Sequence, residues 1–427
     1  MSELMTLHPN VKWRLFVGFV TTTATMVVSP YLVIFFVGKI GSVSTGILYM
    51  LTILSAMVGS AVGGHLSETW GRKRVMTLSE AMMGVTMFAI ASVNSPWLDL
   101  PYLTAGLFVL NMFFNGSFQP ATMTLILDCS TPTSREMIFR VNYWANNLAI
   151  AIGSLIGGYV FIPHHFATFL VVGTMAFGSV AVTAFVLTDT PEGSRRPPRP
   201  TSRAPGLARI FRVYVYALRD KAFAFFLVGS VAIAAIQNQL TNYIGVHLTT
   251  RLSHTARLSM SLIHARVSGA QLLGLLKSEN TLLVVVFALV VVRLMKRMNE
   301  RMKIFLGTAL FTLGFFLLTF SLDPGVLLLA MLVATLGELV YTPVLQSVLG
   351  HIAPEDARGI YMALYQVAAY ASEIIAGAFI ILGRFLTPFA VGLCILTLGI
   401  LASGFFGMTL RLKGPPIDDT LQKVTHA

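Results

Sequence analysis

The chain has 427 residues, of which 55% are hydrophobic and 11% are charged, and its formal net charge is +12. A soluble globular protein carries about twice that charged fraction, so the composition excludes a soluble fold with a polar surface. The positive charge alone would be compatible with a nucleic-acid partner. Its distribution along the chain excludes that partner, because the basic residues gather in particular loops between apolar stretches.

Twelve apolar stretches, each a candidate membrane-spanning helix, follow one another along the chain. The predicted spans of the first half are 13–37, 45–66, 75–93, 102–127, 138–161 and 168–187. Those of the second half are 222–246, 281–294, 304–322, 325–348, 360–382 and 386–410. The eighth is short unless it begins further upstream, near Ala270. The pattern predicts an all-α membrane protein with 12 transmembrane helices.

A segment rich in proline and arginine, 189–220, separates the two sets of six helices. Its composition excludes a spanning helix and predicts an extended cytoplasmic linker, within which 207–219 could form an amphipathic helix. The predicted domains are therefore an N-terminal six-helix bundle, 1–188, and a C-terminal six-helix bundle with a cytoplasmic tail, 221–427. The outer loop 247–280 is expected to carry an interfacial amphipathic helix.

The distribution of positive charge predicts the topology. With a cytoplasmic N-terminus, about 24 of the 30 Lys and Arg residues fall on the cytoplasmic side. We therefore expect a multi-pass protein of the cell membrane with both termini in the cytoplasm, the lipid bilayer as its surroundings and no nucleic-acid partner. No basic segment of the signal-peptide type precedes the first span, which would serve as an uncleaved anchor. Cys129 and Cys394 lack metal-ligand spacing and are expected to be free thiols.

The loop between the second and third spans reads Gly-His-Leu-Ser-Glu-Thr-Trp-Gly-Arg-Lys-Arg over residues 64–74. Gly64 and Gly71 allow close helix approach and a tight turn, while Glu68 and Arg72 supply opposite charges. This order and spacing resemble the signature loop of the major facilitator superfamily, roughly G-x-L-a-D-r-x-G-r-k. The resemblance implies two six-helix bundles that rock around a central cavity, with this loop stabilising the outward-facing state.

A further feature that extends the resemblance is Asp128, at the inner end of the fourth span. It resembles the acidic residue that pairs with the arginine of the loop, so we predict a contact with Arg72. A solvated carboxylate is the alternative.

Small residues in the fifth span, Gly153, Gly157 and Gly158, form a close-packing helix face. They resemble the G-P-x-x-G-G core of drug/proton antiporters, with serine in place of proline. The alternative is glycine packing that indicates nothing about the direction of transport.

Segments 141–147, 239–248 and 336–343 resemble parts of a lactococcal multidrug/proton antiporter of the same superfamily. This resemblance implies that Glu338 is a membrane carboxylate linked to proton coupling and cation recognition. Asn142 and Thr241 stand where that transporter type has aspartates. The fourth span also lacks the arginine found in many proton-linked exporters, so an arginine-dependent proton relay does not carry over.

Glu338 is also a candidate without any resemblance. A carboxylate near the middle of the membrane is unfavourable unless it faces protein or water, and desolvation favours its neutral form, so it could bind and release protons. A structural role, hydrogen-bonded to Tyr341 or the backbone, is the alternative. Glu373, deep in the eleventh span, is the second coupling candidate, with packing as the alternative. Glu80 is expected to snorkel or to pair near the inner surface.

Polar groups at helical spacing are candidates to line a substrate cavity, although amides can equally hold helices together. They are Asn115, Gln119, Asn142, Asn146, Gln239, Asn242 and Tyr341. No nucleotide-binding loop, metal-spaced histidines or nucleophile elbow is present, so we expect no enzyme, no cofactor and no metal site.

The sequence therefore predicts a monomeric secondary transporter that exports small amphiphilic molecules in exchange for protons. One alternative keeps the fold but makes the protein a lipid or lysolipid translocator, or an uncoupled facilitator. A second alternative, of another class, is a membrane receptor or scaffold that transports nothing.

Overall fold

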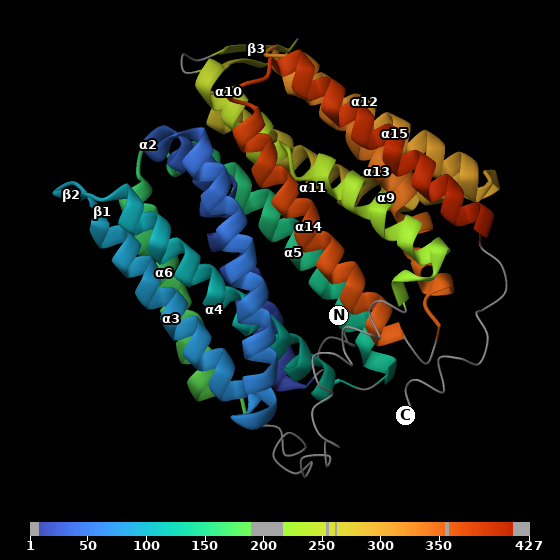
Figure 1. Ribbon diagram of the computed structural model, residues 1–427. Coiled ribbons are helices and arrows are strands. Elements are labelled where there is room, and N and C mark those ends of the chain that lie inside the picture. The colour runs from blue at the N-terminus through green and yellow to red at the C-terminus, as the bar shows by residue number, and fades with distance from the viewer. Residues whose placement is uncertain are drawn as a thin grey trace. The chain divides into compact units, whose positions relative to one another are not determined.

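The computed structural model describes residues 8–130, 132–188, 217–252, 256–260, 263–354 and 358–412. Most of the predicted linker 189–220, nearly all of its amphipathic segment 207–219 and almost all of the C-terminal tail lie outside these ranges. The helices of the first half are α2 (Pro9–Thr69), α3 (Arg72–Val93), α4 (Pro101–Asp128), α5 (Pro132–Val160) and α6 (His165–Ala181), which continues as the π-helix η1 (Val182–Val186) (Figure 1).

The second half begins with α9 (Lys221–Gln237), the π-helix η2 (Leu240–Ile244) and α10 (Gly245–Arg251). It continues with α11 (Gly269–Leu294), the 3-10 turn η3 (Met295–Arg297), α12 (Glu300–Phe320), α13 (Pro324–Ile352), α14 (Arg358–Leu382) and α15 (Pro388–Leu412). Within the described ranges, nine helices are long and apolar enough to cross a membrane. The fold is therefore that of an all-α membrane protein.

The first of these helices contains two spans. α2 is 61 residues long, and Gly41 interrupts it with φ 80° and ψ 164°. Only glycine adopts this backbone conformation readily, so the chain can change direction there. The two arms of α2 match the first two predicted spans, and the described helices are consistent with the predicted count of twelve.

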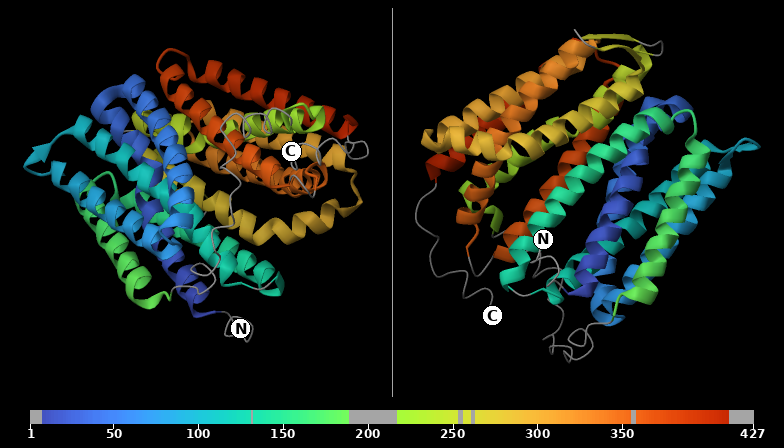
Figure 2. Two further views of the ribbon diagram at one scale, coloured as in Figure 1. Left: turned by 60° about the horizontal axis from the view of Figure 1, so that its bottom comes forward. Right: turned by 180° about the vertical axis from the view of Figure 1, so that it is seen from behind.

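The chain folds as two compact units, Met1–Arg199 with Gly245–Val285, and Pro200–Ile244 with Val286–Ala427. In the first unit, α2 packs on α4 and α5, and α3 packs on α4 and α6 (Figures 1 and 2). In the second unit, α9 packs on α14 and α15, and α12 packs on α13 and α15. The predicted division at 189–220 stays a prediction.

The segment 247–280 differs from its prediction. It forms no interfacial amphipathic helix in its described part; strands β3 (Ala256–Met260) and β4 (Ile263–Val267) pair antiparallel, and α11 begins directly afterwards at Gly269. The helix starts this early because Leu272, Leu273 and Leu276 are fully buried. The eighth span thus begins upstream, next to Ala270. A second, two-residue hairpin, β1 (Asn94–Ser95) with β2 (Leu98–Asp99), connects α3 to α4.

Candidate functional site

Glu338 lies at the middle of the 29-residue helix α13 and is partly buried. The side-chain amide of Gln237, the last residue of α9, donates a hydrogen bond to Glu338 Oε1 over 3.0 Å. Pro343, one turn further along α13, has no N–H to give to the carbonyl of Leu339. The carboxylate therefore lies on a helix with a proline-weakened backbone and contacts the end of a neighbouring helix.

The end of α9 is a break within a longer membrane segment. Residues 238 and 239 form a turn, and the chain resumes as the π-helix η2. Gln239 and Asn242 are 0% and 1% exposed, and their amides donate to Ala235 O (2.8 Å) and Asn238 O (2.7 Å). These two predicted cavity residues therefore satisfy carbonyls of the broken helix, and it is Gln237 that reaches the carboxylate.

The same break connects to α14. The Asn238 amide donates to Ser372 Oγ over 3.2 Å, and Ser372 is 1% exposed. Glu373 follows directly in sequence, is partly buried, and makes no hydrogen bond or ion pair with another described side chain. Both predicted coupling residues thus lie on helices that contact the break after α9, Glu338 through Gln237 and Glu373 beside Ser372.

Tyr341 belongs to the packing of α13 against α12. It is 5% exposed, its ring lies edge-on to Phe311 at 5.5 Å, and a Cβ at Gly307 would meet its backbone nitrogen at 2.8 Å. Its expected place in a substrate cavity stays a prediction.

The loop 64–74 contains the turn between α2 and α3. Gly71 has φ +93°, a conformation that favours glycine, and Arg72 begins α3. Arg72 forms an ion pair with Asp128 at the end of α4, which is the contact expected from the sequence. Glu68 is exposed. The role of these residues in the conformational equilibrium stays a prediction.

Gly64 does not make the expected close approach, since a Cβ there would meet nothing within 4 Å. The glycine before it does, because a Cβ at Gly63 would overlap the backbone of Ser117 on α4. Gly59, one turn earlier, meets Phe113 in the same way. The second arm of α2 and α4 are thus in backbone contact along two turns.

The predicted glycine face of α5 contacts two helices. A Cβ at Gly153 or Gly157 would overlap carbonyl oxygens of α2. A Cβ at Gly158 would lie 2.9 Å from the carbonyl oxygen of Ala270 on α11. The Tyr31 hydroxyl of α2 donates to the carbonyl of Ser154, between these glycines. The small residues therefore act in close helix packing. Whether they also indicate the direction of transport stays a prediction.

The predicted cavity amides of the first unit have different surroundings. Asn146 is partly buried, and its Oδ1 accepts a bond of 3.5 Å from the Thr22 hydroxyl of α2. Asn115 and Asn142 are partly buried, and Gln119 is exposed. No described contact assigns these residues to a cavity, so their role stays a prediction.

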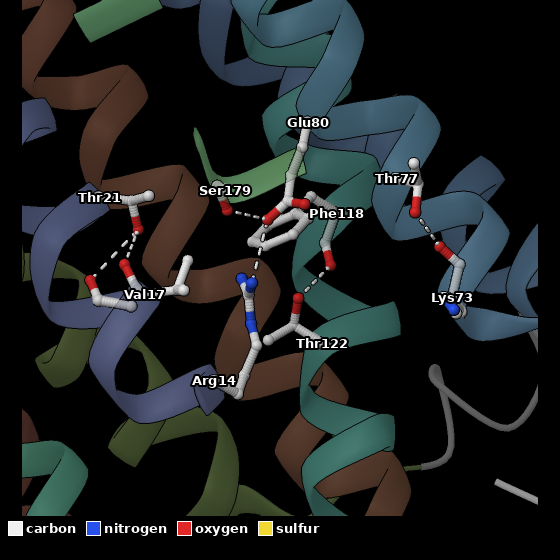
Figure 3. A network of polar contacts seen from close by, with 10 residues as sticks. Arg14, Val17, Thr21, Lys73, Thr77, Glu80, Phe118, Thr122 and Ser179 are labelled. Carbon is white, nitrogen blue, oxygen red and sulfur yellow. Dashed lines mark hydrogen bonds and ion pairs between the residues drawn. The ribbon is translucent and has the colours of Figure 1, made fainter. Parts of the chain in front are cut away.

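A buried charge network lies in the first unit (Figure 3). Arg14 Nη1 donates to Glu80 Oε1 over 3.0 Å, and both side chains are 5% exposed. The Ser179 hydroxyl donates to the same oxygen over 2.5 Å, and the guanidinium lies 4.5 Å from the Phe118 ring centroid. One ion pair therefore links α2, α3, α4 and α6. Glu80 pairs as expected, although deep inside the unit and with a partner the sequence did not identify.

The sequence pattern does not indicate three groups that the structure brings into polar or buried positions. Helical spacing favours Gln239 and not Gln237, although both are on the same segment. Arg14 has the pattern of an ordinary basic residue near the first span. Glu279 and its neighbour Lys277 fall in the predicted outer loop, because the predicted eighth span begins at Thr281. The apolar run before Lys277 is the signal that could have identified them.

Comparisons with known proteins agree with this architecture. The model of the Major Facilitator Superfamily matches residues 14–377 and 267–421. A Na(+), Li(+), K(+)/H(+) antiporter of Planococcus maritimus is 27% identical over 363 residues, covering 83% of this chain and 84% of that protein. The MFS-type transporter YqjV of Bacillus subtilis, itself uncharacterized, is 22% identical over 92% of this chain and 88% of its own length.

Solved structures of transporters share the fold. A POT family transporter in complex with 5-aminolevulinic acid superposes with a TM-score of 0.71 at 15% identity, and 99% of each chain is covered. The nucleoside transporter NupG gives a TM-score of 0.71 at 14% identity, over 94% of this chain and 100% of that one. At these identities the likeness concerns the fold alone.

Proposed function

Because the chain belongs to the major facilitator superfamily, it is a secondary transporter and not an enzyme, and we propose that it exchanges protons for a cationic substrate at Glu338. The observation that carries the proposal is the hydrogen bond of 3.0 Å from Gln237, at the break in α9, to the mid-helix carboxylate of Glu338. A membrane carboxylate that is neutral when protonated and attracts a cation when ionised can bind the two ligands alternately.

The break after α9 provides the means of coupling occupancy to conformation. A proton on Glu338 weakens the charge-assisted bond that Gln237 donates, while a cation on the carboxylate competes for the same oxygens. Asn238 donates a hydrogen bond to Ser372, which is next to Glu373 in sequence. A movement of the break would therefore also displace this part of α14. Glu373 is the second coupling residue in this proposal. Transport requires only that the ligands stabilise the two conformations to different extents.

Two classes of cation fit the carboxylate. The sequence predicts small amphiphilic molecules as the substrate, and among these a cationic amphiphile would suit the carboxylate. The Planococcus relative, by its name, exchanges Na⁺, Li⁺ and K⁺ for protons, which supports an inorganic monovalent cation. We propose the inorganic cation as the first substrate to test and the amphiphilic one as the second. The proposed setting is the cell membrane, with a monomer and both termini cytoplasmic.

The test uses the purified protein in proteoliposomes with an imposed pH gradient. Flux of Na⁺ or K⁺, and separately of a fluorescent cationic amphiphile, is compared between wild type and Glu338→Gln. Glu300→Gln is the matched control, because Glu300 is an exposed carboxylate in the first turn of α12. We expect gradient-driven flux in wild type and in the control, and none in Glu338→Gln.

If the flux is the same with and without the pH gradient, and the same in wild type and Glu338→Gln, the proposal is contradicted. That result would favour an uncoupled facilitator or a lipid translocator. The absence of flux for every substrate, combined with ligand-dependent changes in conformation, would favour a receptor or scaffold.

A further inference from the structure

The early start of α11 places a further carboxylate, besides Glu338 and Glu373, inside a candidate membrane span. α11 begins at Gly269 and is 26 residues long, and its candidate span is Gly269–Ala288. Glu279 is at the centre of that span, roughly 15 Å from the start of the helix at 1.5 Å per residue. This is the depth at which the hydrocarbon core, about 30 Å thick, is farthest from water.

The neighbours of Glu279 fix the direction in which this part of α11 packs. Gly274 lies against α5, where a Cβ would meet the Ser154 carbonyl oxygen at 2.7 Å. Ser278 is 5% exposed and donates to Ala151 O over 2.7 Å. These residues form one stripe, and Glu279 follows it by a single helical step of about 100°. The carboxylate is therefore at the edge of the α5–α11 contact, where one of its oxygens, Oε2, is buried.

The charge of Glu279 has no partner among the described residues. Oε2 is buried without a hydrogen bond, and no ion pair involves this side chain in the described ranges. Lys277 is on the same helix, but side chains two positions apart do not face each other. On α5 the charged residues, 135, 136 and 140, are in its first three turns, about 16 Å or more before Ala151 at 1.5 Å per residue.

The described residues of α2 and α10, which also contact α11, supply no charge at this depth either. On α2 the hydroxyl of Tyr31 is level with Gly274, and the nearest basic side chain along that helix is Lys39, eight positions later. On α10, His247 and Arg251 belong to the segment that meets Gly269, at the beginning of α11. Within the described chain, Glu279 is thus a membrane carboxylate to which packing offers no cation.

An ionised carboxylate in this position would be strongly unfavourable, whereas a protonated one is neutral and can donate a hydrogen bond. We propose that Glu279 is a further proton-binding carboxylate of the transporter, separate from Glu338 and Glu373, and that it releases its proton during the transport cycle. This rests on the proposed proton-coupled antiport and adds a further proton to it. The proton is the ligand; it leaves the carboxyl group when a conformational change admits water or a cation.

The first test does not depend on transport. The apolar reagent dicyclohexylcarbodiimide reacts with protonated carboxyl groups, and mass spectrometry of the reconstituted wild-type protein locates the modified residue. We expect labelling of Glu279 at about pH 6 that falls by about tenfold or more at about pH 9. The exposed Glu300 is the internal control and should stay unlabelled at both.

The second test measures the proton-to-cation ratio from the pH gradient at which net flux stops. Glu279→Gln should lower this ratio relative to wild type, whereas Glu279→Asp, which keeps a titratable carboxyl, should retain it. Agreement of the Asp variant with wild type also shows that substitution at this position leaves the fold intact.

The proposal is overturned if Glu279 is labelled no more than Glu300 or if its labelling is the same at both pH values. It is also overturned if Glu279→Gln has the same proton-to-cation ratio as wild type. Failure of the proposed antiport looks different, because wild type would then show no gradient-driven exchange at all. In that case the labelling experiment alone decides whether Glu279 binds a proton.

Discussion

Arg14 and Glu80 form an ion pair of 3.0 Å in which each side chain is only 5% exposed, and Ser179 donates to the same carboxylate oxygen (Figure 3). The described polar contacts of the pair are the ion pair itself and the Ser179 hydroxyl, and the guanidinium also lies over the Phe118 ring. The pair therefore ties the first arm of α2 to α3 and α6 at a place where neither charge has an alternative described partner.

Glu80→Gln should destabilise the first unit by roughly 3–5 kcal/mol, because it leaves the guanidinium of Arg14 buried and unpaired. The double variant Arg14→Met, Glu80→Met removes both charges and should recover most of that loss. Denaturant or thermal unfolding in detergent measures the difference. A single variant as stable as the double one would show that the pair is solvated.

Ser179→Ala should destabilise by less, about 1.5–3 kcal/mol, since it removes one hydrogen bond to a charged acceptor and leaves the ion pair in place. The same unfolding measurement checks the ranking. If Ser179→Ala and Glu80→Gln were equally harmful, the hydroxyl and not the guanidinium would be the main partner of the carboxylate.

The ion pair between Arg72 and Asp128 offers a charge-reversal test. The side chains are 22% and 20% exposed, so solvent screens the pair, and Asp128→Arg should shift the conformational equilibrium by roughly 1 kcal/mol, about fivefold in population. Combining it with Arg72→Asp should restore the transport rate. A double variant as slow as either single one would mean that the residues act separately.

Glycine packing in α5 can be tested with a matched pair. Gly157→Ala should destabilise by about 1–3 kcal/mol, because the added methyl meets the Val27 carbonyl and the Tyr31 ring. Gly178→Ala in α6 meets nothing within 4 Å and should be neutral or stabilising by up to about 1 kcal/mol through helix propensity. Equal effects on the melting temperature would contradict the close contact of α5 with α2.

Cys129 provides a pH prediction outside the spans. Burial raises the pKa of its thiol, while the hydrogen bond from Asn10 and the charge of Arg72 lower it in part. A raised pKa means less thiolate at neutral pH, so a maleimide should modify Cys129 more slowly than a solvent-exposed thiol and faster as pH rises.

The measurement uses a Cys394→Ser background, which leaves a single thiol. Arg72→Gln removes the nearby positive charge and should slow the modification further, whereas Arg140→Gln, at an exposed position on α5, serves as the control. Modification at neutral pH as fast as that of a free cysteine would show that the thiol is solvated.

Local patterns in the sequence determined the elements of this protein. Apolar stretches predicted helices of membrane-spanning length, and α11 showed how a few polar residues can mislead. Lys277, Glu279 and Asn280 interrupt the apolar run, so the local pattern predicts that the span begins at Thr281. Tertiary packing extended it to Gly269, because the contact of Gly274 and Ser278 with α5 makes the polar segment stable in the helix.

The sequence by itself predicted the class of protein, the position of the loop 64–74 and the presence of the carboxylate Glu338 within a span. These features depend only on residue type and on spacing over a few residues. Only the tertiary structure decided which side chains meet. Gln237 rather than Gln239 reaches Glu338, and Gly63 rather than Gly64 contacts α4. One residue along a helix turns a side chain by about 100°. Which neighbour it then meets depends on how distant segments pack, and no local pattern specifies that.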